Sequence, residues 1–280
     1  RLGMPAAGVV DEGEQSRDGY DVIVDAFGEG APAPMYATVP LEQAEAVLTT
    51  ASGTEGVVDA RIVAEPAESG RTVVRITPST SVDSEETEAL VNTLRDDLDA
   101  AAPDALLGGP GTQNTDLTAA LLDSALLAVI AIMVVAFVLL LVVFRSWVIA
   151  VASILFNLTI VAASFGFATI VFQHGVGASL IGIQHQGFVD AWAPLFFFAL
   201  LFGLSMDYQL FLLAAIKERR DATGDARRAV TEGVARTGRP ITNAALIMIV
   251  VFIAFGVTGP IPPTELGLTL AVAVALDATV

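Results

Sequence analysis

The hydrophobic positions of this chain follow two different patterns, and the change between them falls near residue 122. From residue 124 onward, five long apolar runs follow one another. Each is close to the ~20 residues that a helix needs to cross the hydrocarbon core of a bilayer. A soluble core could hold one such run, but five in succession could hardly be buried otherwise. The sequence therefore predicts an α-helical membrane bundle over residues 123–280, with spans at about 124–144, 147–172, 191–216, 241–259 and 261–280.

Residues 1–122 contain shorter segments with helical or alternating apolar spacing. One helix is expected at 16–28, before the main series. The order that follows is strand, helix, strand, strand, helix, strand, which is the split pattern of ferredoxin-like sandwiches. We therefore predict an α+β ferredoxin-like, porter-type domain over residues 1–122, followed by a flexible segment that leads into the first span. The six elements are expected at 35–39, 41–51, 56–64, 71–78, 84–101 and 104–109.

Charge separates the same two parts. Residues 1–122 carry 22 of the 31 acidic residues and 6 of the 14 basic ones, as expected for a domain that faces water. The net charge of −17 argues against nucleic acid as a partner. The chain has no cysteine, and so no disulfide framework or thiolate metal site.

The basic residues also indicate the orientation in the membrane. Arg145 lies between the first two spans, and seven basic residues lie in the loop 217–239, whereas the loop 173–190 has none. Because loops rich in Lys and Arg stay in the cytoplasm, residues 1–122 and the loop 173–190 are expected to be extracytoplasmic. A helix over 224–236 is expected to lie along the cytoplasmic surface.

An acidic residue, Asp207, interrupts the third span near its middle. A charged Asp at that depth costs ~2.5–3.5 kcal/mol, so an intramembrane acid is by default a functional hypothesis. Desolvation would bring such a carboxyl toward neutral pH, where it could load and release a proton. The alternative is a neutral acid that bonds a neighbouring helix. Tyr208 could relay that proton or could be a packing aromatic.

Four further polar residues are candidates for the same site. Asp277 in the last span is expected at a depth similar to that of Asp207, which suggests one shared polar seam. Ser205 is small and can hydrogen-bond across helices. Thr242 and Asn243 could support the site or could be ordinary polar residues at the end of a span.

Other titratable residues in the membrane part give no catalytic or metal site. Glu265 is expected to be interfacial, and His174 and His185 lack metal-ligand spacing. We find no nucleophile with a base and no phosphate-binding loop, so the sequence predicts neither an enzyme nor a cofactor.

The segment "FGLSMDYQLFLLAAIKE" (202–218) resembles the signature of the MMPL transporters, within the resistance–nodulation–division superfamily. "SRDGYDVIVDAFGEG", "TGRPITNAALIMIVVFIAF" and "LGLTLAVAVALDATV" are similar to further segments of that family. The resemblance covers nearly the whole chain. Gln209 replaces a common Glu, and Ala214 and Ala215 replace a common Ser-Arg.

The resemblance implies a function that composition alone does not give. It implies a bacterial inner-membrane transporter that uses the proton-motive force to export lipids or other hydrophobic molecules, with a proton relay at Asp207, Tyr208 and Asp277. The family consists of a twice-repeated unit, so we expect this chain to be a fragment of the second repeat, with the first repeat as its partner. The alternatives are a related protein-export auxiliary and a lipid sensor or scaffold that transports nothing.

Overall fold

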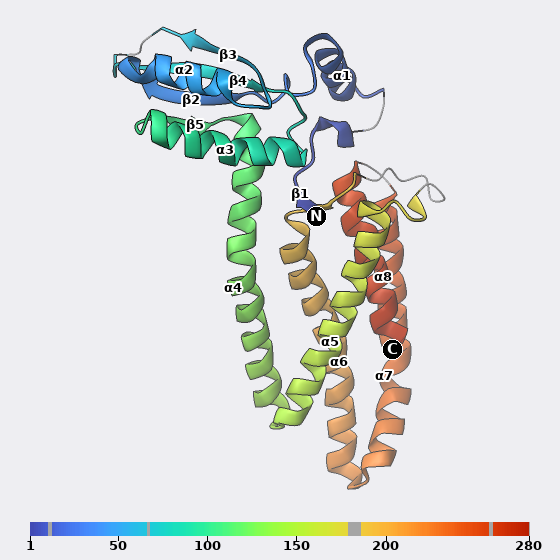
Figure 1. Ribbon diagram of the computed structural model, residues 1–280. Coiled ribbons are helices and arrows are strands. Elements are labelled where there is room, and N and C mark those ends of the chain that lie inside the picture. Colours follow the sequence, from blue (N-terminus) through green and yellow to red (C-terminus); the bar gives the residue numbers. More distant parts are fainter. Residues whose placement is uncertain (11–12, 66–67, 179–185, 258–259, 280) are drawn as a thin grey trace. The chain divides into compact units, whose positions relative to one another are not determined.

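The computed structural model describes residues 1–10, 13–65, 68–178, 186–257 and 260–279 (Figure 1). The chain divides into two compact units, one of residues 2–120 and one of residues 121–280 together with Arg1. We call them the sheet unit and the membrane unit. Each has its own cluster of buried apolar side chains.

The sheet unit contains a four-stranded antiparallel sheet with the strand order β3-β4-β2-β5. The helix and the six later elements expected from periodicity are all present, and the helix expected at 41–51 begins with a short 3-10 turn, η2. Its elements are β1 (Leu2–Gly3), η1 (Ala7–Val9), α1 (Gln15–Phe27), β2 (Met35–Pro40), η2 (Leu41–Gln43), α2 (Ala44–Gly53), β3 (Val57–Ala64), β4 (Arg71–Pro78), α3 (Glu85–Ala101) and β5 (Leu106–Gly108).

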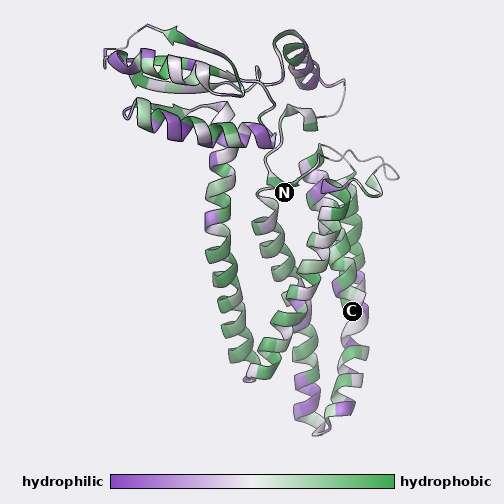
Figure 2. Ribbon diagram, in the orientation of Figure 1, coloured by the Kyte–Doolittle hydropathy of each residue, from purple (hydrophilic) through white to green (hydrophobic). Residues whose placement is uncertain are grey.

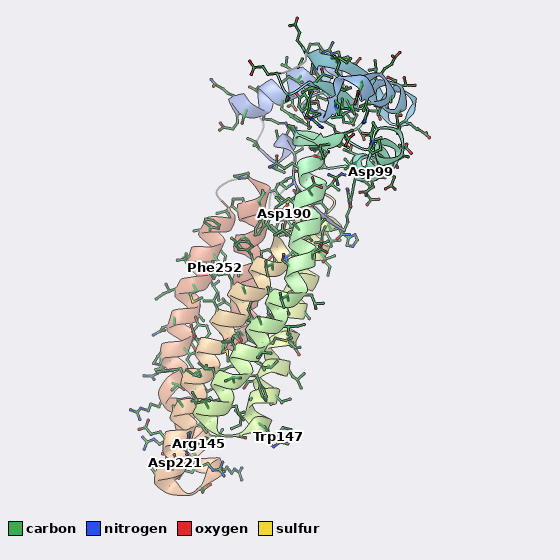
Figure 3. All side chains as sticks on the ribbon, turned by 90° about the vertical axis from the view of Figure 1, so that its left-hand side faces the viewer. Asp99, Arg145, Trp147, Asp190, Asp221 and Phe252 are labelled. Carbon is green, nitrogen blue, oxygen red and sulfur yellow. The ribbon has the colours of Figure 1, made fainter. Side chains whose placement is uncertain are left out.

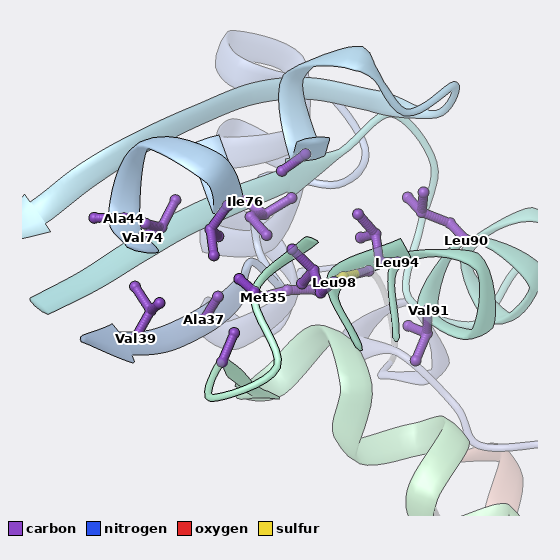
Figure 4. Packing of buried hydrophobic residues seen from close by; sticks show 14 residues of the cluster. Met35, Ala37, Val39, Ala44, Val74, Ile76, Leu90, Val91, Leu94 and Leu98 are labelled. Carbon is purple, nitrogen blue, oxygen red and sulfur yellow. The ribbon is translucent and has the colours of Figure 1, made fainter. Parts of the chain in front are cut away.

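The core of the sheet unit lies between the sheet and helices α2 and α3 (Figure 4). Every second residue of β2 is buried, as alternation along a half-covered strand requires. Leu94 and Leu98 lie one turn apart on α3 and are buried in the same cluster. The α3 helix begins as predicted, because the Ser84 hydroxyl accepts a hydrogen bond from the Thr87 backbone N–H at 3.1 Å.

The membrane unit has five helices that are long and apolar enough to cross a bilayer, as the sequence predicts (Figure 2). A π-helical turn and a short strand lie between the second and third of them. The elements are α4 (Pro110–Phe144), α5 (Trp147–Ala168), η3 (Thr169–Gln173), β6 (Val189–Asp190), α6 (Ala193–Thr223), α7 (Ala226–Gly256) and α8 (Ile261–Thr279).

Two sequence predictions about the connections are wrong. The segment expected to be flexible before the first span is helical, because α4 already begins at Pro110. Proline suits the first helical position, where its missing N–H has no intrahelical partner.

The loop 217–239 and its separate surface helix do not form either. Instead, α6 continues to Thr223, the chain turns at Gly224, and α7 runs unbroken from Ala226 to Gly256. Gly224 has a left-handed φ of 72°, and the Asp225 carboxylate accepts hydrogen bonds from the N–H groups of Arg227 and Arg228. Pro240 lies inside α7 and removes one helical hydrogen bond without ending the helix.

Glycines allow α7 and α8 to approach each other closely. A Cβ atom on Gly267 would lie 2.6 Å from both the Gly256 nitrogen and the Phe252 carbonyl oxygen. Real Cβ atoms do not approach backbone so closely, so only glycine fits at this contact. Small residues that let helix backbones meet are typical of membrane bundles.

We predict that Gly267→Ala forces α7 and α8 apart and lowers the stability of the protein by about 1–3 kcal/mol, as overpacking does. Thermal unfolding in detergent measures this change. Gly166→Ala is the matched control, because a Cβ there meets no atom within 4 Å. An unchanged unfolding temperature for Gly267→Ala would contradict the close contact.

Candidate functional site

Polar side chains from three membrane helices meet inside the membrane unit. The Ser205 hydroxyl of α6 lies 2.6 Å from Asn157 Oδ1 of α5 and 2.5 Å from Asp277 Oδ1 of α8. Gln209, one helical turn after Ser205, donates from Nε2 to the same Asn157 oxygen at 2.6 Å. We call Asn157, Ser205, Gln209 and Asp277 the polar cluster. Asn157 and Ser205 are buried, and so they are shielded from solvent on all sides.

The number of protons in the polar cluster constrains its chemistry. The Ser205 hydroxyl carries one proton, so it cannot donate to Asn157 Oδ1 and Asp277 Oδ1 at once. Either Asp277 is protonated and donates to Ser205, or the amides of Asn157 and Gln209 are turned so that Asn157 donates to Ser205 and Ser205 to a charged Asp277. The same heavy-atom arrangement therefore accommodates both protonation states of Asp277. That property suits a group that gains and loses a proton.

Asp207 lies outside the polar cluster. It is two residues after Ser205, so it points about 200° away around the helix, and its side chain is exposed. The apolar residues Phe196, Leu200 and Phe211 are exposed on the same side of α6. The structure therefore does not place Asp207 on the face of α6 that contacts Asp277 of α8. The polar cluster includes Asp277 and does not include Asp207.

Tyr208 lies between the two acids and faces α7. Its hydroxyl donates to the Met248 sulfur at 2.7 Å. It is close enough to interact electrostatically with both Asp207 and Asp277. Tyr208 is thus near both acids, while its hydroxyl bonds a residue of α7.

An open cavity of about 630 Å³ lies between α5, α6, α7 and α8. Tyr208, Gln209 and Asp277 line it, and so does Thr242. The remaining lining is mostly apolar and extends along α7 to Val234, near the turn that joins α6 and α7. Asn243 is exposed and is not among the lining residues.

Sequence reasoning missed Asn157, which connects α5 to the polar cluster. The available signal was that Asn157 is the sole amide side chain between residues 147 and 172. A polar group in the middle of an apolar span needs a hydrogen-bond partner just as a charged group does. The position of Gln209 one turn after Ser205 was a second available signal, because it places both polar side chains on one face of α6.

Glu265, which the sequence predicts to be interfacial, lies near the beginning of α8. Its side chain is fully buried, and its Oε2 accepts a hydrogen bond from the Asp190 backbone N–H at 3.4 Å. The strand β6 therefore covers the beginning of α8. His174 is exposed at the end of η3, and His185 lies outside the described residues. Within the described ranges, no three His, Cys, Asp or Glu side chains gather as a metal site would require.

Five long apolar helices around a titratable polar cluster define a multi-span membrane protein. The model of the MMPL family matches residues 9–280. The chain belongs to the MMPL family, within the resistance–nodulation–division superfamily, as the segment around Asp207 indicates.

Curated relatives include three mycobacterial proteins. The chain is 33% identical to the mycolic acid-containing lipids exporter MmpL11 of Mycolicibacterium smegmatis, over 96% of this chain and 30% of that protein. It is 34% identical to the heme uptake protein MmpL11 of Mycobacterium tuberculosis H37Rv, over 96% of this chain and 29% of that protein. The trehalose monomycolate exporter MmpL3 of Mycolicibacterium smegmatis is 31% identical over 66% of this chain and 19% of that protein. The chain thus spans less than a third of the length of these relatives.

We predict that Ser205→Ala destabilises the membrane unit by about 1–3 kcal/mol, because it leaves the buried Asn157 and the partly buried Asp277 without their shared hydroxyl. Ser164→Ala is the control, since Ser164 is equally buried but bonds only the Ile160 carbonyl of its own helix. Thermal unfolding of the two variants in detergent makes the comparison. Equal losses in both would show that the polar cluster adds nothing to the packing of α5, α6 and α8.

Proposed function

We propose that this protein belongs to a proton-driven exporter of lipids or other hydrophobic molecules. The observation that carries the proposal is the hydrogen bond between Ser205 and Asp277 inside the helix bundle, in an arrangement that accepts Asp277 with or without its proton. A carboxyl that is only structural needs one protonation state. A carboxyl that couples proton flow to transport needs two.

The distribution of basic residues supports an orientation for the membrane unit. The end at which α6 meets α7 carries seven of them, and Lys217 from this end donates to the Val143 carbonyl at 2.8 Å, close in sequence to Arg145. Figure 3 labels Arg145 and Asp221 at this end of the unit and Asp190 at the opposite end. Under the positive-inside rule, the end with Arg145 is cytoplasmic in a bacterial plasma membrane, and the sheet unit is extracytoplasmic.

The strand order of the sheet unit supports the proposal of a ferredoxin-like porter domain. Its strand order β3-β4-β2-β5 is the order that a β-α-β-β-α-β chain adopts when its two helices pack on one antiparallel sheet. In the proposed exporter, this unit opens and closes a route for the substrate.

Proton transfer through the polar cluster would drive the cycle. A proton reaches Asp277 from outside, and Asp277 then donates to Ser205. When Asp277 releases the proton into the cavity lined by Tyr208 and Gln209, Ser205 turns to donate to the charged carboxylate. Because these groups hold α5, α6 and α8 together, each proton changes the bonds between three helices. One proton moving through 100 mV supplies ~2.3 kcal/mol for that change.

In the proposed relay, Asp207 would contact another part of the full-length protein. An exposed acid on an apolar helix face would be expensive against lipid, by ~2.5–3.5 kcal/mol on the lenient scale. This face of α6 is therefore expected to pack against protein and not against lipid. The relatives are about three times as long as this chain, and we assign this packing partner to the first repeat of the full-length protein.

The names of the relatives support a large hydrophobic cargo. Two of them are lipid exporters, and the third is a heme uptake protein. We propose a lipid as the cargo of this protein, because the names of both exporters refer to lipids that contain mycolic acid.

We predict that Asp207→Asn and Asp277→Asn each reduce export of a labelled lipid to background in cells that express the full-length protein. Asn keeps the size and hydrogen bonding of Asp but cannot titrate. The matched control is Asp221→Asn, an exposed carboxylate further along α6 that should export normally. Membrane levels of each variant are checked by immunoblot. Normal export by both relay variants would reject proton coupling and favour a lipid sensor or scaffold.

A further inference from the structure

Two buried acids lie at the end of the membrane unit opposite the basic end. Asp190 of β6 and Glu265 of α8 are both fully buried. The Asp190 backbone N–H donates to Glu265 Oε2 at 3.4 Å, and Gln186 Nε2 donates to Asp190 Oδ1 at 2.9 Å. The Trp192 side chain is close enough to lower the pKa of Asp190, against the larger effect of burial. We call Asp190 and Glu265 the outer acid pair.

The outer acid pair has unused acceptors and few cations nearby. Among the described residues, Asp190 Oδ2 and Glu265 Oε1 are buried and have no hydrogen-bond partner. By sequence, α5 has no charged residue, α6 has none before Asp207, and α7 has none after Arg239. Other charges near β6 are Arg1, whose guanidinium lies 5.8 Å from the centre of the Phe188 ring, and His174 at the end of η3.

A proton fits these acceptors better than a metal ion does. Calcium takes about 6–8 oxygen ligands and magnesium about six. The pair offers two free carboxyl oxygens, and Gln186 adds one free amide oxygen. Two like charges in a desolvated place do not both ionise readily, so one proton resolves the conflict. Burial raises the pKa of Asp190 to about 6, so a raised affinity for protons is already present at this carboxyl.

Polar groups continue from the outer acid pair along one side of α8 toward Asp277. Thr269 follows Glu265 by one turn, is fully buried, and its hydroxyl has no partner among the described residues. Two turns further on is Asp277. Beside Asp277, a cavity of about 10 Å³ has about the volume that one water needs. It is lined by Ser205, Asp277 and the apolar residues Ile160, Leu201, Leu204, Ala273 and Val274. The residues 265, 269, 273 and 277 are spaced four apart, and the path from Glu265 to Asp277 is about 18 Å long.

The geometry points to a second proton-binding site at Asp190 and Glu265, which supplies protons to Asp277 along α8. The direction of flow rests on the proposed function and its orientation. A proton from the outer solution binds the carboxylate of the pair and lowers its negative charge by one. It then passes toward Asp277 through the Thr269 hydroxyl and a chain of water molecules, because the ~12 Å of helix between Thr269 and Asp277 is longer than one water spans. At each step one O–H bond forms as another breaks. The pair regains its charge when the proton leaves.

The pH dependence follows from the raised pKa of Asp190. The carboxyl holds its proton below about pH 6 and loses it above, so the folded contact between β6 and α8 is favoured at low pH and weakens as the pH rises through about 6. Asp190 therefore takes up a proton from an acidic outer solution and releases it toward a neutral one.

The binding of the proton is tested by infrared difference spectroscopy on the full-length protein during a pH titration. We expect a protonated-carboxyl band that weakens as the pH rises through about 6, as Asp190 loses its proton. This change should be absent in Asp190→Asn and present in Asp207→Asn and Asp277→Asn. Asp221→Asn controls for exposed acids. A change that survives in Asp190→Asn would overturn the site.

The supply of protons to Asp277 is tested by export. Thr269→Val keeps the shape of the side chain but removes the hydroxyl, and we expect it to slow export by roughly tenfold or more, as the loss of a positioned proton-transfer group does. Thr159→Val is the control, because Thr159 bonds only Leu155 of its own helix. Normal export by Thr269→Val would overturn the path. If Asp207→Asn and Asp277→Asn also export normally, the proposed function fails as well, while the infrared band still decides whether the proton site exists.

Discussion

The energetic cost of placing charged oxygen atoms in hydrocarbon determines where the polar side chains of the membrane unit lie. The three acids of its spans meet this cost in different ways. Asp277 bonds Ser205 between helices, and Glu265 is buried beneath β6. Asp207 is exposed on an apolar face of α6 and needs a cover. The arrangement of α5, α6 and α8 follows from these requirements as much as from apolar packing.

The five spans and the main elements of the sheet unit could be predicted because hydrophobic period is a local property of the sequence. The connection between α6 and α7 could not be predicted in this way. Proline commonly marks the boundary of a helix, but Pro240 lies inside the continuous helix α7. Whether a proline ends a helix depends on what neighbouring helices and side chains supply to the freed carbonyl. That information is tertiary.

The candidate site was predictable in its residue types and less so in its geometry. Asp277 and Ser205 were expected and lie in contact. The face on which Asp207 lies depends on the rotation of α6 relative to its neighbours, which no single span encodes. Asn157 was missed because an amide carries no charge, although burial makes its hydrogen bonds nearly as obligatory. The burial of Glu265 was not predicted because the strand that covers it comes from a distant part of the chain.

Helix α8 combines close packing with titratable groups, and the two properties depend on each other. Of the five spans, α8 is the most buried, since 50% of the residues in its most apolar stretch are buried. Gly267 brings it against α7 at backbone distance, which keeps lipid away from its outer half. Glu265 and Asp277 share this helix, so a charge on either acid acts on the neighbouring helices. A tightly held helix can therefore convert a change in protonation into a change in the contacts of α5 and α6, whereas an exposed helix such as α4, with 11% of its window buried, could not.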